Sequence, residues 1–224
     1  MKAFTNVNPR DLKQAFAAIG AASAARQKAA IAGGGSDLLQ LMRERIVTPD
    51  VLVNLKSIST MKGIAVARQG VTIGGSTTLA TIAADDRLRR SHAVLVEAAE
   101  SVATPQIRNV GTIAGNVCQR PWCWYYRNGF TCLKNGGSVC FSAGGENEFH
   151  AIFGGGPSYI VHPSDTAPAL VALDARFTIA SSRGERTVAA REFFTLPTVN
   201  PAAENVLAEG EVLTTIHVPA AAAG

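Results

Sequence analysis

The spacing of apolar positions predicts a small unit of alternating helices and strands at the start of the chain. Leu12, Phe16 and Ile19 recur at helical spacing, and Asn8-Pro9 supplies an N-cap followed by a first-turn proline. Short apolar runs further along predict two strands with a helix between them, which is the βαβ pattern. The expected elements are a helix over 9–20, a strand at 29–32, a helix over 38–45 and a strand at 51–53.

From residue 64 onward, short apolar runs around glycine-bearing turns predict antiparallel hairpins. We expect hairpins at 64–73 and 177–190, helices at 78–84, 91–103 and 164–173, and strands at 159–161 and 212–218. The stretch 104–156 has no clear period, and its aromatic content argues against disorder. The predicted fold class is therefore α+β, with a small βαβ-like unit (1–57) and a larger unit (58–224) whose sheet is mainly antiparallel.

Composition and charge narrow the class of protein. Hydrophobic residues make up 47% and charged residues 17%, which is typical of a globular chain. The net charge is +4 and the basic residues form no long runs, so we expect no nucleic-acid partner. No uncharged apolar stretch reaches ~18 residues, so we expect no membrane span. The N-terminus lacks the apolar core of a secretory signal, which favours the cytoplasm, or the periplasm if a partner carries the signal.

All four cysteines fall within one short segment, which indicates a metal site or a pair of disulfides. Four, eight and seven residues separate Cys118, Cys123, Cys132 and Cys140. Zinc sites usually present close cysteine pairs at both ends, and here only the first pair is close. Four thiolates on an irregular loop suit a [4Fe–4S] cluster. We favour the cluster, and zinc or disulfides remain open.

The neighbours of these cysteines support a redox centre. An aromatic group beside Cys123 is expected to exclude water, and three basic residues can offset the charge of a thiolate-ligated cluster. The aromatic residues are Trp122, Trp124, Tyr125 and Tyr126, and the basic ones are Arg120, Arg127 and Lys134.

Two glycine loops carry a second kind of signal. Residues 32–38 (Ala-Gly-Gly-Gly-Ser-Asp-Leu) lie between a predicted strand and helix, where glycines let the backbone N–H groups approach a pyrophosphate. The motif is neither a dinucleotide fingerprint nor a Walker loop, so a plain turn with Ser36 as the N-cap is the alternative. Residues 109–116 form a similar loop that leads into Cys118, and 162–168 form a polar strand-to-helix junction.

Taken in order, segments 32–38, 74–78, 108–116 and 164–168 resemble the FAD-binding subunit of the xanthine dehydrogenase/molybdenum hydroxylase family. The resemblance runs from residue 4 to residue 219. The cysteine segment that begins Cys118-Gln119-Arg120-Pro121 resembles the aldehyde oxidoreductase branch, whose FAD subunit carries an additional [4Fe–4S] cluster.

The resemblance implies that FAD lies between the two units. The pyrophosphate cradle would be Ala32, Gly33, Gly34, Gly35, Ser36, Asp37 and Leu38. The phosphate and ribityl side would be bound by Gly111, Thr112, Gly115 and Asn116, with Asp165 near the flavin or its ribityl chain and Leu213 by the isoalloxazine ring. Two departures stand out: the first loop is one glycine longer than the family's usual Ala-Gly-Gly-Thr-Asp-Leu, and the chain ends at Gly224. Family members continue there, so we expect the usual C-terminal domain to be absent.

The function implied is electron transfer rather than substrate chemistry. A molybdopterin large subunit would oxidise the substrate, and a [2Fe–2S] small subunit would pass electrons to FAD and on to an external acceptor. No catalytic residue is assigned in this chain. Two alternatives remain: a zinc-stapled binding module without flavin, and a stand-alone flavin oxidoreductase of the same broad fold. Whether the cluster carries electrons or clasps the loop is also open.

Overall fold

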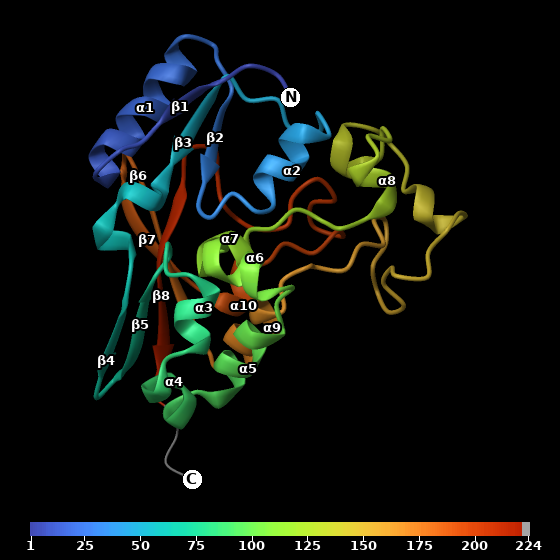
Figure 1. Ribbon diagram of the computed structural model, residues 1–224. Coiled ribbons are helices and arrows are strands. Elements are labelled where there is room, and N and C mark those ends of the chain that lie inside the picture. The colour runs from blue at the N-terminus through green and yellow to red at the C-terminus, as the bar shows by residue number, and fades with distance from the viewer. Residues whose placement is uncertain (221–224) are drawn as a thin grey trace.

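The computed structural model describes residues 1–220, which form two β-sheets with helices packed against each (Figure 1). The first sheet has three parallel strands and the second has five strands in antiparallel pairs. The predicted α+β class is confirmed. The first sheet has the order β1 (Thr5–Val7), β3 (Val51–Asn54), β2 (Ala29–Ala32); the second has the order β4 (Ile64–Ala67), β5 (Gly70–Gly74), β8 (Val212–Pro219), β6 (Arg176–Ser181), β7 (Gly184–Ala189).

The central strand β3 is buried on both faces, with α1 (Leu12–Ala24) packing against one and α2 (Leu38–Arg43) against the other. Val51 and Val53 belong to the hydrophobic cluster that contains Ala15 of α1. Leu52 packs instead with Met42 of α2. Successive side chains of a strand point to opposite faces, so this apolar run serves both helices.

Two details of the N-terminal unit differ from prediction. Strand β1 was not predicted, because its polar residues carry no strand pattern; it forms by pairing with β3. Helix α1 begins later, because Asp11 rather than Asn8 is the N-cap. The Asp11 carboxylate accepts the Gln14 backbone N–H at 2.7 Å.

The five-stranded sheet is covered on one face by helices, as Figure 1 shows. Phe177 of β6 and Ile216 of β8 are fully buried in its core with Leu95, Leu170 and Phe193 from the covering helices. A register shift between β6 and β8 leaves Thr214 as an extra residue on β8, which puts Leu213 and Ile216 on the same core face. The covering helices are α3 (Leu79–Ala83), α4 (Asp86–Ser91), α5 (Ala93–Ser101), α9 (Thr166–Ala172) and α10 (Ala190–Phe193).

The two sheets share buried contacts. Val212, at the start of β8, packs in the same cluster as Val53, Ile58 and Met61. The predicted boundary at residue 57 stays a prediction. No helix within residues 1–220 combines the length and the apolar character needed to cross a bilayer.

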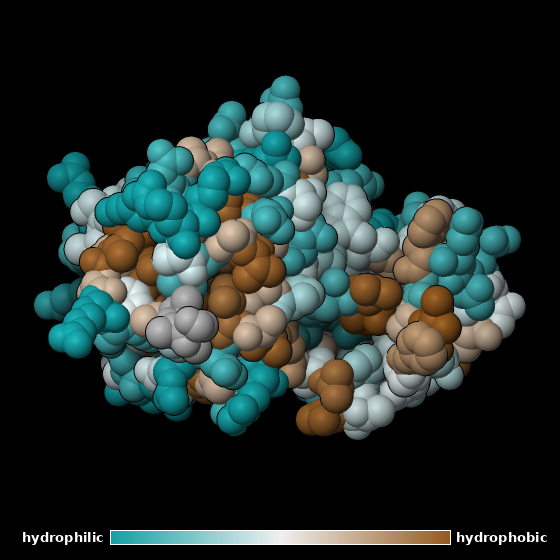
Figure 2. Space-filling model, turned by 90° about the horizontal axis from the view of Figure 1, so that it is seen from below, coloured by the Kyte–Doolittle hydropathy of each residue, from teal (hydrophilic) through white to brown (hydrophobic). Residues whose placement is uncertain are grey.

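The stretch predicted to be irregular is partly helical. It contains α6 (Pro105–Val110), α7 (Ile113–Val117), α8 (Trp124–Arg127) and short turns at Leu133–Asn135 and Phe141–Ala143. No strand forms at 159–161, which corrects the prediction; Tyr159 instead accepts a backbone hydrogen bond from Ala151 in the same loop. Residues 118–160, here called the cysteine loop, form a smaller lobe beside the main body, with apolar residues on its surface (Figure 2).

Candidate cofactor-binding site

A cavity of about 430 Å³ lies between the β2–α2 loop and helices α6 and α7. Twelve of the thirteen predicted cofactor residues line it. Leu213 lies outside, because it is buried in the core of the large sheet. The twelve are Ala32, Gly33, Gly34, Gly35, Ser36, Asp37, Leu38, Gly111, Thr112, Gly115, Asn116 and Asp165.

The glycines of the first loop (residues 32–38) allow it to contact the second loop (residues 109–116) closely. A side chain on Gly33 would collide with the Thr112 hydroxyl, and one on Gly34 with the Val110 carbonyl. Gly35 has φ +80°, a left-handed conformation that favours glycine. The N-cap of α2 is Asp37 and not the predicted Ser36, and the Asp37 side chain makes no capping hydrogen bond.

The second loop rests on the segment 74–79. Ile113 N–H donates to the Thr77 carbonyl at 2.9 Å, and Ala114 N–H to the Gly75 carbonyl at 3.0 Å. Thr112 caps α7 by accepting the Gly115 N–H at 3.1 Å. The segment 74–78 therefore supports the second loop, and it does not line the cavity itself.

Asn116 is held in one orientation by two buried hydroxyl groups. Its Oδ1 accepts from Ser164 Oγ at 2.6 Å and from Thr166 Oγ1 at 2.5 Å. Both hydroxyls come from the third polar motif, at the start of α9. Because Oδ1 is occupied, the amide N–H₂ of Asn116 is the group available to a ligand in the cavity. Asp165, between the two hydroxyl residues, is exposed at the cavity rim.

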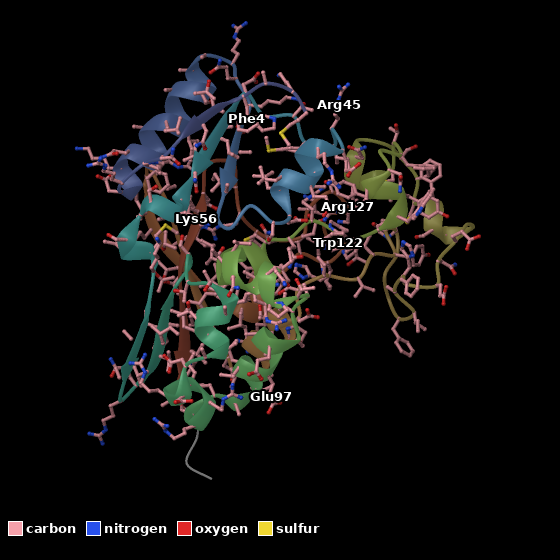
Figure 3. The ribbon with its side chains drawn as sticks, in the orientation of Figure 1. Phe4, Arg45, Lys56, Glu97, Trp122 and Arg127 are labelled. Carbon is pink, nitrogen blue, oxygen red and sulfur yellow. The ribbon has the colours of Figure 1, made fainter. Side chains whose placement is uncertain are left out.

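The cysteine loop adds residues to the cavity that the sequence did not assign to it. Gln119, Arg120 and Trp122 line the wall, and Trp122 is 55% exposed. The Arg127 guanidinium lies over the Trp122 indole at 4.4 Å, so the two residues lie side by side (Figure 3). Because Trp122 precedes Cys123 in sequence, it was expected to shield a cluster. The structure places it on the wall of the large cavity. Apolar wall residues such as Val102 and Ile107 belong to no motif.

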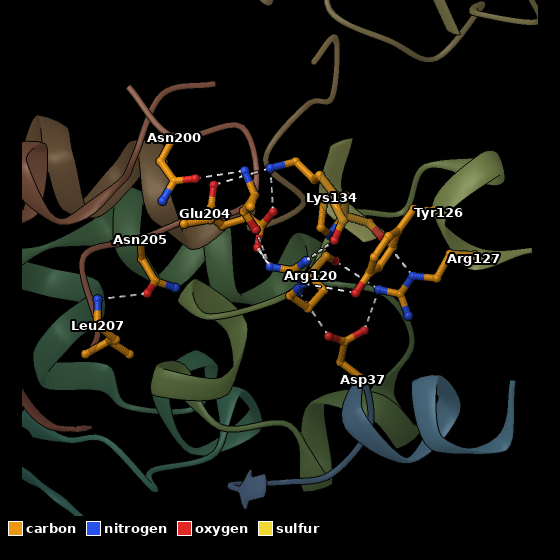
Figure 4. A network of polar contacts seen from close by, with 12 residues as sticks. Asp37, Arg120, Tyr126, Arg127, Lys134, Asn200, Glu204, Asn205 and Leu207 are labelled. Carbon is orange, nitrogen blue, oxygen red and sulfur yellow. Dashed lines mark hydrogen bonds and ion pairs between the residues drawn. The ribbon is translucent and has the colours of Figure 1, made fainter. Parts of the chain in front are cut away.

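Asp37 joins the first loop to the cysteine loop (Figure 4). Its Oδ1 accepts from Arg127 Nη2 at 2.7 Å, and its Oδ2 from the Arg120 backbone N–H at 3.2 Å. The Arg127 side chain is only 9% exposed, so the pair is shielded from water. The arginine therefore offsets the charge of a carboxylate that lines the cavity.

Glu204 makes a second link, from the segment before β8. Its carboxylate pairs with Arg120 and with Lys134 Nζ, the latter at 2.7 Å. The Glu204 and Lys134 side chains are each 2% exposed. The basic residues predicted to offset a cluster are thus paired with Asp37 and Glu204 (Figure 4).

The four cysteines separate into three and one. Cys123, Cys132 and Cys140 line a second cavity, of about 10 Å³, whereas Cys118 lines the large cavity and packs against the main core. All four are free thiols, so the structure forms neither of the disulfides left open. Within residues 1–220, no group of three or more His, Cys, Asp or Glu side chains lies at metal-ligating distances. The structure does not bring the four predicted ligands together in one cavity, and their shared role as cluster ligands stays a prediction.

The thiols also differ in their surroundings. Burial raises the pKa of Cys118 to about 12. Burial also raises the pKa of Cys123, although the backbone N–H groups of Tyr126 and Tyr125 oppose it. Burial acts in the same direction on Cys140, but hydrogen bonds from the Ser142 hydroxyl and nearby backbone N–H groups outweigh it and lower the pKa.

The aromatic shield predicted around Cys123 is only half formed. Tyr125 and Tyr126 are buried, but Trp122 and Trp124 are 55% and 60% exposed. Tyr125 stacks with Phe141 and meets Phe130 edge to face, and Tyr125 and Phe141 line the small cavity. His150 Nε2 lies 3.3 Å from Cys123 Sγ.

The chain is similar to known proteins along nearly its whole length. The family described as "FAD binding domain in molybdopterin dehydrogenase" matches residues 2–221. The aldehyde oxidoreductase FAD-binding subunit PaoB of Escherichia coli K12 is 34% identical over 190 residues, which are 83% of this chain and 60% of that protein. The carbon monoxide dehydrogenase medium chain of Hydrogenophaga pseudoflava is 28% identical over 96% of this chain and 58% of that protein.

The fold also matches solved structures. A carbon monoxide dehydrogenase from Hydrogenophaga pseudoflava that lacks the Mo-pyranopterin moiety superposes with a TM-score of 0.71 at 26% identity, over 99% of this chain and 60% of that chain. The chain therefore spans about 60% of the length of these three relatives. These relatives are subunits of oxidoreductases, and the chain belongs to the family of FAD-binding domains found in molybdopterin dehydrogenases.

Proposed function

We propose that this chain binds FAD in the 430 Å³ cavity and serves as the electron-transferring unit of a molybdenum-containing aldehyde oxidoreductase or xanthine dehydrogenase-type complex. The observation that carries the proposal is the contact between the two glycine loops. Residues that are 70 to 80 positions apart in sequence meet there, with no room for side chains between them, and line one cavity. Its volume falls within the range of cofactor sites.

The residues present suit a flavin dinucleotide. The backbone of Gly33, Gly34 and Gly35 would hold the pyrophosphate, because the short loop after β2 leaves N–H groups free of side-chain cover. Asn116 would donate its amide N–H to the phosphate or ribityl side. When bound, FAD supplies reversible electron exchange.

The cysteine loop would close one side of this site. Trp122 and Arg120 line the cavity, and Arg127 holds both the Trp122 ring and the Asp37 carboxylate. These contacts would orient the loop wall and limit the access of water. The positive charge of Arg127 would also reduce repulsion between Asp37 and an anionic ligand.

Partners and electron flow are part of the proposal. Relatives are named as an FAD-binding subunit and as medium chains, which supports a multi-subunit assembly. We propose a [2Fe–2S] small subunit as the electron donor, a molybdopterin large subunit as the place of substrate oxidation, and an external acceptor. A stand-alone flavin oxidoreductase is the alternative, and co-purification of the chain with such subunits from its native source would decide between them.

The predicted [4Fe–4S] cluster stays a prediction. Cys118 lies apart from the other three cysteines, so we assign no electron step to a cluster held by all four. A zinc-stapled module without flavin is disfavoured by the family match and by the large cavity.

The test is a titration of the flavin-free protein with FAD and with FMN. We expect one FAD per chain and FMN binding at least about tenfold weaker, because FMN lacks the diphosphate and adenosine that the first loop would hold. Absent flavin binding, or equal affinity for FMN, would overturn the proposal.

A variant pair sharpens this test. Asn116→Asp keeps an oxygen for the two hydroxyl groups but replaces the amide donor with a negative charge, so we expect FAD affinity to fall about tenfold or more. Asn6→Asp adds the same charge at an exposed position of β1, outside the cavity, and should leave the affinity unchanged.

A further inference from the structure

The Trp122 indole stands on the wall of the large cavity with more than half of its surface uncovered. Trp122 lines this cavity and is 55% exposed, although tryptophan is highly buried on average. The Arg127 guanidinium lies over its ring, 4.4 Å from the ring centroid (Figure 3). Because a cation of this kind covers one face of an indole, the opposite face is open to a second planar group.

The Trp122 ring is held in place from two directions. Its Nε1–H donates to Gln119 Oε1 at 3.3 Å, which gives the one polar group of the ring a partner. Arg127 is itself fixed, because its Nε donates to the Pro121 carbonyl at 2.7 Å and its Nη2 to Asp37 Oδ1 at 2.7 Å. A ring that is already oriented loses little conformational freedom when a ligand packs on it.

Trp124, two residues further along, provides the contrast. It is 60% exposed, but it does not line the large cavity. Its ring packs instead against neighbours in the cysteine loop, edge to face with Tyr125 at 5.5 Å and tilted against Phe130 at 5.6 Å between centroids. Exposure alone therefore does not distinguish Trp122. Its place on the cavity wall and its fixed ring with one covered face do.

We propose that the uncovered face of the Trp122 indole stacks on a planar aromatic ring of the bound dinucleotide, and that Arg127 is the positioning residue that holds the indole for this contact. The inference rests on the proposed function, because it needs FAD in the large cavity. FAD carries two such rings, the isoalloxazine and the adenine, and an aromatic side chain can stack on either flat π-system. The cysteine loop then contributes directly to cofactor affinity.

The test is a titration of flavin-free variants with FAD. Trp122→Ala should bind FAD at least about tenfold more weakly than wild type, because a stacked ring contributes on this scale. Trp122→Phe keeps a ring and should stay within about threefold of wild type. Trp124→Ala is the matched control and should leave the affinity unchanged, because Trp124 lies outside the cavity.

Equal FAD affinity in the Trp122→Ala and Trp124→Ala variants would overturn the inference and leave the proposed function in place. Wild type that binds no FAD would overturn the proposed function, and the inference with it.

ADP and FMN, which carry one ring each, identify the ring that stacks. Weaker binding of ADP alone by Trp122→Ala assigns the contact to adenine, and weaker binding of FMN alone assigns it to the isoalloxazine; either supports the inference. Unchanged affinity for both would show that the indole contacts neither ring. An equal loss for both would indicate a disturbed cavity wall rather than a stacked ring, and would also overturn the inference.

A double-mutant cycle tests Arg127. Arg127→Lys keeps a positive charge for Asp37 but has no planar group to lie over the indole. It should weaken FAD binding at least about threefold in the wild-type background and add no further loss to Trp122→Ala. An equal loss in both backgrounds would show that Arg127 does not act through Trp122.

Thermal unfolding of the flavin-free variants reports on folding. Trp122→Ala and Trp124→Ala should unfold at the same temperature, because both side chains are more than half exposed. If Trp122→Ala unfolds earlier, Trp122→Leu takes its place with the same expected loss of FAD affinity, because leucine keeps apolar bulk without an aromatic face. FAD affinity in Trp122→Leu equal to that in Trp124→Ala would then overturn the inference.

Discussion

At Gly33 and Gly34, the neighbouring loop leaves room for no side chain beyond a hydrogen atom. The Thr112 hydroxyl and the Val110 carbonyl occupy the places where the two Cβ atoms would stand. These glycines therefore serve the contact between the loops as well as any approach to a phosphate. Close packing between the two loops requires glycine at these two positions, and cofactor binding depends on that packing.

Gly34→Ala tests this contact. The added methyl group would press against backbone atoms, which cannot rotate away, so the loops must separate. We expect lower thermal stability and at least about a tenfold loss of FAD affinity, measured by calorimetry and titration.

The control is Gly20→Ala, in α1, where the new methyl group meets open space. It should leave FAD affinity unchanged and stabilise the protein by up to about 1 kcal/mol, because alanine favours a helix interior. Normal FAD binding by Gly34→Ala would show that the two loops need not touch.

At the scale of elements, the N-cap residues determine where the short helices begin. Thr78 caps α3, Asp85 caps α4, Thr104 caps α6 and Thr112 caps α7, each through a side-chain oxygen that accepts a backbone N–H. Helices of five or six residues are marginal alone, so the cap and the core contact decide where they form. Apolar periodicity by itself missed α6 and α7, which begin at such caps.

The N-cap of α4 is sensitive to pH, because its capping residue is Asp85. A hydrogen bond from the Arg87 side chain, helped by the backbone N–H groups of Leu88 and Arg87, lowers the pKa of Asp85 to about 2 against the effect of burial. A carboxyl whose pKa is lower in the folded state stabilises the fold above its ordinary pKa of 3.8, and this contribution is lost as the pH falls through about 2.

We therefore expect Asp85→Ala to reduce the free energy of unfolding by about 1 kcal/mol at pH 7, with the difference from wild type shrinking below about pH 4. Urea unfolding at several pH values measures it. Asp85→Asn keeps a capping oxygen without the charge, so most of its stability should remain at pH 7. A loss that stays constant down to pH 2 would contradict the role of the ionised carboxylate.

Across the whole molecule, two carboxylates attach the cysteine loop to the body. Asp37 does so from the first loop and Glu204 from the segment before β8. Breaking a buried ion pair by removing one partner is costly, because the other charge stays buried. The lobe seen in Figure 2 is therefore tied to the cavity it adjoins.

Glu204→Gln should reduce the free energy of unfolding by about 3 kcal/mol, because Arg120 and the buried Lys134 lose their counter-charge. Chemical unfolding measures this, and hydrogen exchange over residues 128–160 should rise. Glu44→Gln, which removes an exposed pair with Arg43, should change stability by less than about 0.5 kcal/mol. Equal effects of the two variants would show that Glu204 does not hold the loop.

The sequence by itself determined the local parts of this protein. Apolar spacing and turn residues predict several elements: β2, the glycine loop that follows it, α2, the two hairpins and α9. These signals depend only on residues close together in the sequence. The same local chemistry placed twelve of thirteen candidate cofactor residues in one cavity, because the motifs that carry them stand at the ends of these elements.

Only the tertiary structure decided which residues face each other. Spacing grouped four cysteines, but the fold sends Cys118 to the main core and brings Ser158 to the other three. The bulge at Thr214 turns Leu213 into the core, and β1 exists only through its pairing with β3. Such outcomes depend on contacts between residues far apart in the chain, and local propensity carries no information about those contacts.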